Sequence, residues 1–400
     1  METYHGLHVD EVISSLSDFL RRPDVCIATA LQLGLSIFLA HGYDFRVAYV
    51  AGSNIVKGAS PYLGGSVSGW MVLGWGSQVQ GLGETPIWAL YLGVCYFLSS
   101  GQPFIFNFLT KMPIVAANTS LAYFTYSRGI KGWRFFLLNI YLIATSVTWG
   151  KPDNLATILA IAALVATDSA TSSALLLSTS LMIKPLAVAI LPAFFLRLKH
   201  MPRLWSAGFI GETFLASVGM FFGPFVIFGW PIETVINGFS SWFGHAGALS
   251  PFNFIAIENG TEQLPSALWW TGYLVLFAAL AMIAYAMVRE TQNTLRYALL
   301  SAAVFFTLRP WNSEQNLVII LTLFILVRGE LGSRWLWVIP MMFALANNAI
   351  QLQFYLLMPT IVNELNQLYV PVDIYRLWLK FFLSLAWLVV LWSNLSRLRK

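Results

Sequence analysis

Long apolar stretches alternate with short polar segments along almost the whole chain. The apolar stretches cover residues 25–40, 104–124, 134–149, 154–167, 171–183, 185–196, 207–229, 267–288, 297–308, 315–327, 335–346 and 376–394, with a shorter one at 87–100 after Pro86. A helix needs roughly 20 apolar residues to cross a bilayer, and several stretches are shorter than that. We therefore expect an all-α integral membrane protein with about 12 transmembrane helices, some short or broken inside the bundle, where protein groups satisfy the backbone.

The composition supports this prediction. Of the 400 residues, 58% are hydrophobic and 10% are charged, whereas soluble domains spend about a quarter of their residues on charge. We expect one polytopic membrane domain over residues 25–400. Residues 1–24 contain acidic side chains and no long apolar core, which excludes a cleaved signal peptide. They predict a cytoplasmic amphipathic helix at the interface, whose apolar side comprises Val9, Val12, Ile13, Leu16, Phe19 and Leu20.

The positive charges predict the orientation. The net charge of +5 would suit nucleic acid, but the chain has no basic face, so we exclude that partner. If the N-terminus is cytoplasmic and the twelve stretches are crossings, 15 of the 23 Lys and Arg fall in inside loops, as the positive-inside rule requires. Both termini are then cytoplasmic, and the long loops 41–86, 230–266 and 347–375 lie outside, at the outer plasma membrane face or in the endoplasmic reticulum lumen.

The first outer loop, 41–86, carries an isolated acidic residue. Apolar residues over 45–56 alternate with polar ones as in an amphipathic surface helix, which Gly58, Ser60 and Pro61 end. The glycines of 64–83 contain no phosphate-loop motif and predict close packing instead. Asp44, just past the first span, is either the N-cap of the surface helix or a general base at the membrane face.

Other charged residues lie between apolar stretches. Lys151 and Asp153 are expected to form a local ion pair. Lys184, at a break before Pro185, has no carboxylate nearby in sequence and suits an anionic ligand such as a phosphate. One explanation of Arg309 and Glu314 is mutual neutralisation. A base above a cation-lined cavity that opens into lipid suits attack on a lipid-phosphate-linked substrate.

Metal and nucleophile signatures are missing from the sequence. The five histidines, including His245 in an outer loop, show no metal-site spacing, and Cys26 and Cys95 both lie in apolar stretches. No G-x-S-x-G occurs either.

The order of several short segments resembles the catalytic subunit of glycosylphosphatidylinositol mannosyltransferase I and its prokaryotic relatives, which are integral-membrane glycosyltransferases of the GT-C class. The matching segments are Asp44-Phe45-Arg46-Val47, Val56-Lys57-Gly58-Ala59-Ser60-Pro61-Tyr62-Leu63, Gly150-Lys151-Pro152-Asp153-Asn154, Met182-Ile183-Lys184-Pro185, Ile190-Leu191-Pro192, Phe228-Gly229-Trp230, Ser250-Pro251-Phe252 and Asn312-Ser313-Glu314-Gln315-Asn316. They extend from about residue 40 to 330. The resemblance implies a GT-C fold and inverting transfer of mannose from a polyprenyl (dolichyl-type) phosphate donor to a hydroxyl of a glycan or glycolipid acceptor.

The same resemblance implies roles for individual residues. Asp44 would take the acceptor proton, and Lys184, Lys151 and Arg309 would hold the donor phosphate as its charge grows. We assign acceptor or sugar contacts to Asp153, His245, Glu314 and Gln315. The family often has Asp-x-Asp in the first loop, whereas this chain reads Gly42-Tyr43-Asp44, so we expect no bound metal and no required cofactor.

Three alternatives stay open at this point. The same machinery could transfer another sugar, such as glucose or a pentose. The chain could instead be a non-catalytic GT-C-like scaffold subunit of a membrane complex, and an accessory subunit is compatible with the active interpretation too. A secondary transporter would explain the broken helices, but its expected inverted repeats are not evident.

Overall fold

The computed structural model describes residues 9–72, 76–165, 169–236, 247–259, 266–289, 294–369 and 373–399. These residues form 18 α-helices and four two-residue strands. The helices are α1 (Val9–Leu20), α2 (Pro23–Phe38), α3 (Gly42–Val56), α4 (Pro86–Leu98), α5 (Pro103–Tyr126), α6 (Phe135–Leu138), α7 (Ile140–Leu142), α8 (Asp153–Val165), α9 (Ala170–Ile183), α10 (Leu191–His200), α11 (Arg203–Phe228), α13 (Asn253–Asn259), α14 (Ser266–Arg289), α15 (Thr294–Leu308), α16 (Val318–Arg328), α17 (Trp335–Ala346), α18 (Pro359–Tyr369) and α19 (Asp373–Ser396). The all-α prediction is confirmed.

The strands pair in two small sheets. β1 (Gly65–Ser66) and β2 (Gln78–Val79) are antiparallel within the first long loop. β3 (Gly247–Ala248) and β4 (Trp311–Asn312) are parallel, so the segment before α13 lies against the polar segment after α15.

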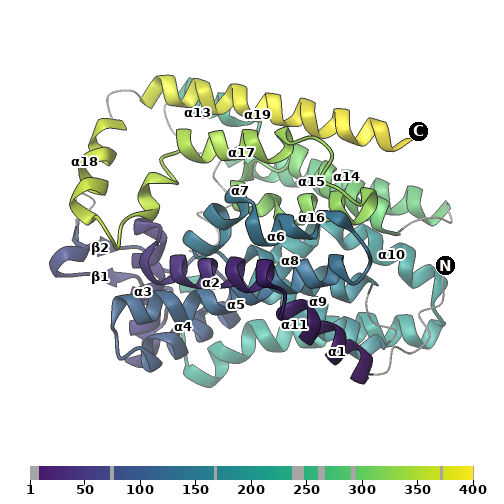
Figure 1. Cartoon of the computed structure of the whole chain (residues 1–400), viewed down its shortest axis with the longest axis horizontal. Coiled ribbons are helices and arrows are strands. Elements are labelled where there is room, and N and C mark those ends of the chain that lie inside the picture. The colour runs from purple at the N-terminus through teal and green to yellow at the C-terminus, as the bar shows by residue number, and fades with distance from the viewer. Residues whose placement is uncertain are drawn as a thin grey trace.

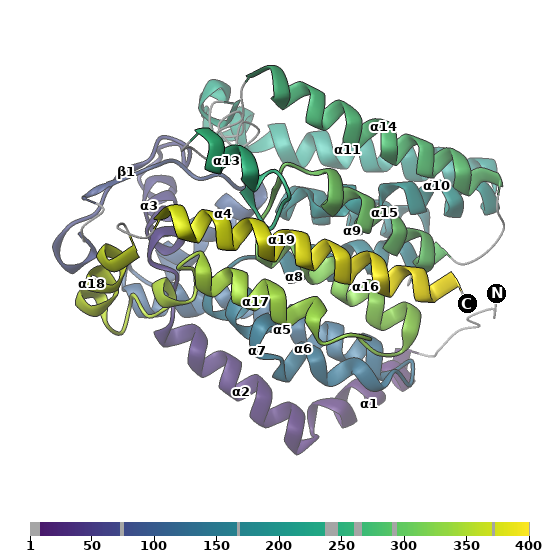
Figure 2. The same cartoon turned by 90° about the horizontal axis from the view of Figure 1, so that it is seen from above.

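Most of the longer helices run along the long axis of the molecule (Figure 1). α3, β1 and α18 lie at one end, whereas α1 and the C-terminal end of α19 lie toward the other, as both views show (Figures 1 and 2). The largest apolar core surrounds α16, whose residues 318–325 are all buried. A second core under α3 and α4 supports the first long loop.

The helices differ in whether they are long enough to cross a membrane. Among the described residues, two helical segments, Arg203–Phe228 and Ile374–Ser396, are long and apolar enough to cross a membrane, and seven apolar helices have 10–17 residues. Several predicted spans are short for local reasons. For example, the predicted 171–183 and 185–196 stretches are separated at Lys184, because Pro185 cannot continue α9 and starts a 3-10 helix, Pro185–Ile190. The multi-pass arrangement stays a prediction.

The predicted N-terminal helix is present as α1, but its apolar side does not all face outward. The Phe19 ring is completely buried, with centroids 5.5, 5.0 and 5.5 Å from Tyr123, Tyr126 and Trp133. Phe19 therefore attaches α1 to the helical body, and the interfacial location of this helix stays a prediction.

The first long loop forms the helix that the sequence predicts, and its glycines pack closely. α3 ends at Val56, before Gly58 with φ of +76°. A Cβ at Gly81 would lie 2.0 Å from the Tyr62 carbonyl oxygen, and one at Gly64 would lie 2.5 Å from that of Val79. Gly64 and Gly81 thus pack against the loop itself, whereas Gly69 and Gly76 have open space at the Cβ position.

Candidate functional site

Asp44 lies in the first turn of α3, and three donors surround its carboxylate. His41 is the N-cap residue of α3, so the alternative in which Asp44 caps this helix is wrong. The His41 Nδ1 atom lies 2.9 Å from Asp44 Oδ2, and the Trp149 indole N–H donates to the same oxygen at 2.5 Å. The His41 and Trp149 rings stack with centroids 4.6 Å apart, which orients both donors.

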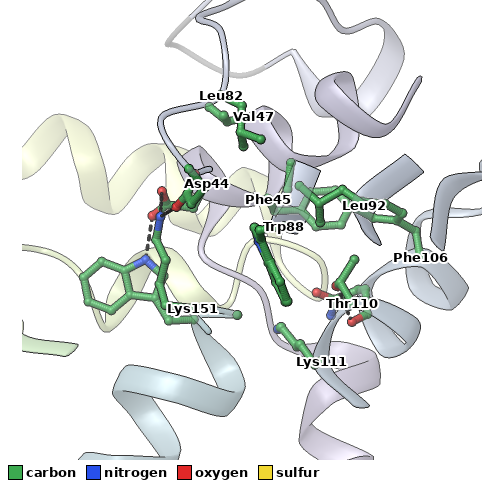
Figure 3. A pocket seen from close by; sticks show the side chains of 15 residues that line it. Asp44, Phe45, Val47, Leu82, Trp88, Leu92, Phe106, Thr110, Lys111 and Lys151 are labelled. Carbon is green, nitrogen blue, oxygen red and sulfur yellow. Dashed lines mark hydrogen bonds and ion pairs between the residues drawn. The ribbon is translucent and has the colours of Figure 1, made fainter. Parts of the chain in front are cut away.

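The third donor is Lys151, which bridges two carboxylates. Its Nζ atom lies 2.8 Å from Asp44 Oδ1 and 2.7 Å from Glu84 Oε1, and Figure 3 shows Asp44 and Lys151 side by side. The predicted ion pair between Lys151 and Asp153 is therefore wrong. The two residues flank Pro152, and Asp153 begins α8 on the buried side, so their side chains diverge.

The electrostatics fix the charges of this cluster. Burial raises the pKa of Asp44, but the charges of Lys151 and His41 and their hydrogen bonds lower it more, so the pKa lies well below its ordinary value. Burial lowers the pKa of Lys151, but Asp44 and Glu84 raise it above its ordinary value. Near neutral pH the pair is thus ionised, and Asp44 is a weak base while Lys151 stays bound to it.

A second lysine–carboxylate pair lies at the start of α8. Asp153 is fully buried; its Oδ2 atom lies 2.7 Å from Lys184 Nζ, and its Oδ1 atom accepts a hydrogen bond of 2.6 Å from the Asn316 amide. Lys184 has no carboxylate nearby in sequence, but α8 brings Asp153 to it from 31 residues away. Asp153, predicted to contact acceptor or sugar, holds Lys184 and Asn316 in this structure.

Arg309 follows the end of α15. The ionisable groups that act on its guanidinium are Tyr273 and Asp153. Glu314 is not among them, so the structure gives no support to neutralisation by Glu314. Glu314 is buried, and its backbone carbonyl accepts a hydrogen bond from the Tyr141 hydroxyl.

The three predicted phosphate-binding cations line one cavity of about 290 Å³. The charged and polar residues of its wall include Glu84, Lys151, Lys184, Arg309, Gln315 and Asn316. Much of the remaining wall is apolar, with Val188, Leu276, Phe277 and Phe305 among its residues. The cavity therefore combines cations for an anionic group with an apolar surface for a hydrocarbon chain.

A smaller pocket of about 30 Å³ lies beside Asp44 (Figure 3). Asp44, Trp88, Lys111 and Trp149 belong to its wall, and Glu84 and Lys151 line both this pocket and the larger cavity. Asp44 is thus joined to the cation-lined cavity through one shared lysine and one shared glutamate.

The predicted residues separate into three groups. Lys151, Lys184, Arg309 and Gln315 line the larger cavity, and Asp44 lies next to it. Asp153 and Glu314 are buried and are not part of either wall. His245 lies outside the described residues. In the described part of the chain, no three His, Cys, Asp or Glu side chains gather where they could hold a metal ion.

Sequence reasoning missed Glu84, His41 and Trp149. A signal for Glu84 was available, because it is the only acidic residue between Asp44 and Asp153 in the printed sequence. His41 and Trp149 gave no comparable signal, since a histidine or tryptophan at a span end is ordinary.

No protein-family model matches this chain, and no curated protein is similar to it in sequence.

Proposed function

We propose that this protein is an inverting glycosyltransferase of the GT-C class, which moves mannose from a polyprenyl (dolichyl-type) phosphate donor to a hydroxyl of a glycan or glycolipid. The observation that carries the proposal is the cavity: Lys151, Lys184 and Arg309 line one space with an apolar wall, next to Asp44. A sugar phosphate with a long hydrocarbon chain has complementary chemistry.

The charge balance supports a donor with one phosphate. Lys151 pairs with Asp44 and Glu84, and Lys184 pairs with Asp153. Within the described chain, no ion pair to a carboxylate is found for Arg309, on which the side chains of Tyr273 and Asp153 act electrostatically. Three cations already face three carboxylates, so a phosphodiester with a single negative charge adds little net charge, whereas a diphosphate adds more.

The surface supports a membrane location. α11 contains an apolar segment of 18 residues, and only 11% of that segment is buried. Its side chains Leu204, Val226 and Ile227 are 87%, 82% and 75% exposed. Such a face is unfavourable in water and suits lipid. α1 and the end of α19 lie away from the first long loop, as cytoplasmic termini and an extracytoplasmic Asp44 require (Figure 1). We therefore include the multi-pass arrangement with about 12 crossings in the proposal.

The proposed reaction is a single displacement. The acceptor hydroxyl oxygen bonds to C1 of mannose, the bond from C1 to the phosphate oxygen breaks, and its electron pair stays on the phosphate. The acceptor proton passes to Asp44. Arg309, Lys184 and Lys151 stabilise the negative charge that grows on the leaving phosphate, and a general base contributes about 10²–10⁴-fold.

The test is transfer from radiolabelled mannosyl-phosphoryl-polyprenol to total membrane lipids by purified protein, with and without EDTA. Asp44→Asn is compared with Asp24→Asn, which removes a carboxylate that pairs with Arg22 and Arg134 far from the cavity. The proposal expects transfer by wild type and by Asp24→Asn, and loss in Asp44→Asn. EDTA resistance would agree with a metal-independent reaction.

One observation favours the scaffold alternative. Three donors contact the Asp44 carboxylate. Such contacts suit a carboxylate with a structural role as well as they suit a general base. Binding of the donor lipid by wild type without transfer of mannose, glucose or a pentose would support that alternative. Glucose or pentose transfer would keep the mechanism and change the sugar.

A further inference from the structure

The contacts of Lys151 point to an exchange of partners: we propose that the phosphate of a bound donor takes Lys151 from Asp44, so that donor binding frees the base. Glu84 is a positioning residue that keeps the ammonium group in place during the exchange. This inference rests on the proposed function, because it requires an anionic donor in the larger cavity.

Lys151 is the one donor to Asp44 that also lines the larger cavity. Among the three donors to Asp44, His41 and Trp149 are absent from the wall of the larger cavity, whereas Lys151 belongs to both walls. An anion in that cavity therefore competes with Asp44 for this donor and leaves the other two unchanged.

Glu84 is the second carboxylate partner of Lys151. It also belongs to both walls, and its Oε1 atom lies 2.7 Å from Lys151 Nζ. A lysine ammonium sits on a flexible stem and can reorient among acceptors, unlike a planar guanidinium. With Glu84 retained as one partner, Lys151 can replace Asp44 by a phosphate oxygen without ever losing a carboxylate contact.

The exchange changes how readily the Asp44 carboxylate accepts a proton. Before the exchange, the Asp44 carboxylate is bound by a cation and two further donors, so it has little tendency to accept a proton. After the exchange, His41 and Trp149 still orient it, but the Lys151 ammonium group no longer contacts it. The base then becomes effective only when the sugar donor is in place, which defines the order of events.

The experiment measures equilibrium binding of radiolabelled polyprenyl phosphate, without sugar, to the purified full-length protein in detergent. Asp44 and the ligand compete for Lys151, so Asp44→Asn should bind at least about fivefold more tightly than wild type, the lower end of usual coupling between sites. In a Lys151→Met background, the added Asp44→Asn change should give no gain. Asp24→Asn controls for the loss of one negative charge.

Each outcome of the binding experiment supports or overturns the proposed exchange of Lys151 partners. Tighter binding by Asp44→Asn that disappears in the Lys151→Met background supports the exchange. An equal gain with Asp24→Asn, or a gain that persists without Lys151, would reveal simple charge repulsion and overturn it. If Lys151→Met does not fold, the comparison of Asp44→Asn with Asp24→Asn decides alone. Binding by wild type that Asp44→Asn leaves unchanged refutes the exchange and spares the proposed function, whereas no binding by wild type refutes both.

Discussion

Two lysine–carboxylate pairs at one cavity differ in what their carboxylates can do. In the pair formed by Asp44 and Lys151, the side chains are 22% and 15% exposed, and the lysine is shared with Glu84. In the pair formed by Asp153 and Lys184, the carboxylate has no exposed surface and its second oxygen is held by Asn316. The same attraction thus holds the partly exposed carboxylate that we propose as the base and a fully buried carboxylate, because exposure and shared partners differ.

The largest expected effect tests the reactive member. Asp44→Asn should lower mannose transfer by about 10²–10⁴-fold and lower the melting temperature less than Asp153→Asn does, since the Asp44 site is partly exposed and the amide oxygen keeps part of its contacts. Transfer assays and thermal unfolding of the same detergent preparation measure both quantities. Transfer at the wild-type rate would show that the two pairs do not differ in the proposed way.

Asp153→Asn should show the reverse pattern. Removing the buried carboxylate leaves the Lys184 charge without its partner, and breaking a buried ion pair costs about 3–5 kcal/mol in the free energy of unfolding. Denaturant or thermal unfolding beside Asp24→Asn, whose carboxylate pair is partly exposed, measures the difference. Equal stability of the two variants would contradict a structural role for Asp153.

Gly150→Ala should damage only the first pair. Gly150 has φ of +89°, and an added Cβ would lie 2.9 Å from Cε of Lys111. Strain at such a position costs about 1–3 kcal/mol and displaces Trp149 and Lys151 on either side. Gly58→Ala, with φ of +76° and nothing within 4 Å, is the matched control for strain without a clash. A larger loss of transfer in Gly58→Ala would argue against this explanation.

The smallest effect concerns pH. The pKa of Asp44 is lowered, so its stabilising effect is present above the ordinary value of 3.8 and is lost as the pH falls below it. The pKa of Lys151 is raised, so its effect is present below 10.5 and is lost at higher pH. The difference in melting temperature between wild type and Asp44→Asn should therefore be flat from about pH 5 to pH 9 and shrink below about pH 4. A difference that changes between pH 5 and pH 9 would contradict this explanation.

Local signals in the sequence predicted several features correctly. The all-α class follows from the apolar stretches, the end of α3 from Gly58, and the break at Lys184 from Pro185. Lys151, Lys184 and Arg309 line one cavity, and their shared role in holding a phosphate stays a prediction.

The partners of these cations were not predictable. Lys151 was expected to pair with Asp153 two residues away, yet Glu84, 67 residues away, and Asp44 hold it. Lys184 has no carboxylate nearby in sequence, yet α8 places Asp153 against it. Phe19 was expected on the apolar side of the N-terminal helix, but its three ring partners, Tyr123, Tyr126 and Trp133, were not predictable.

The sequence by itself determined the helical class, the boundaries near Gly and Pro, and the presence of charges that need partners in apolar surroundings. Only the tertiary structure decided which charge meets which, because helices that pack side by side bring together residues that are distant in the chain. It also decided that Asp44 stays partly exposed and Asp153 does not, since burial depends on the whole set of neighbouring helices. That difference in burial, which no local pattern encodes, distinguishes the carboxylate proposed to react from the one that holds the structure.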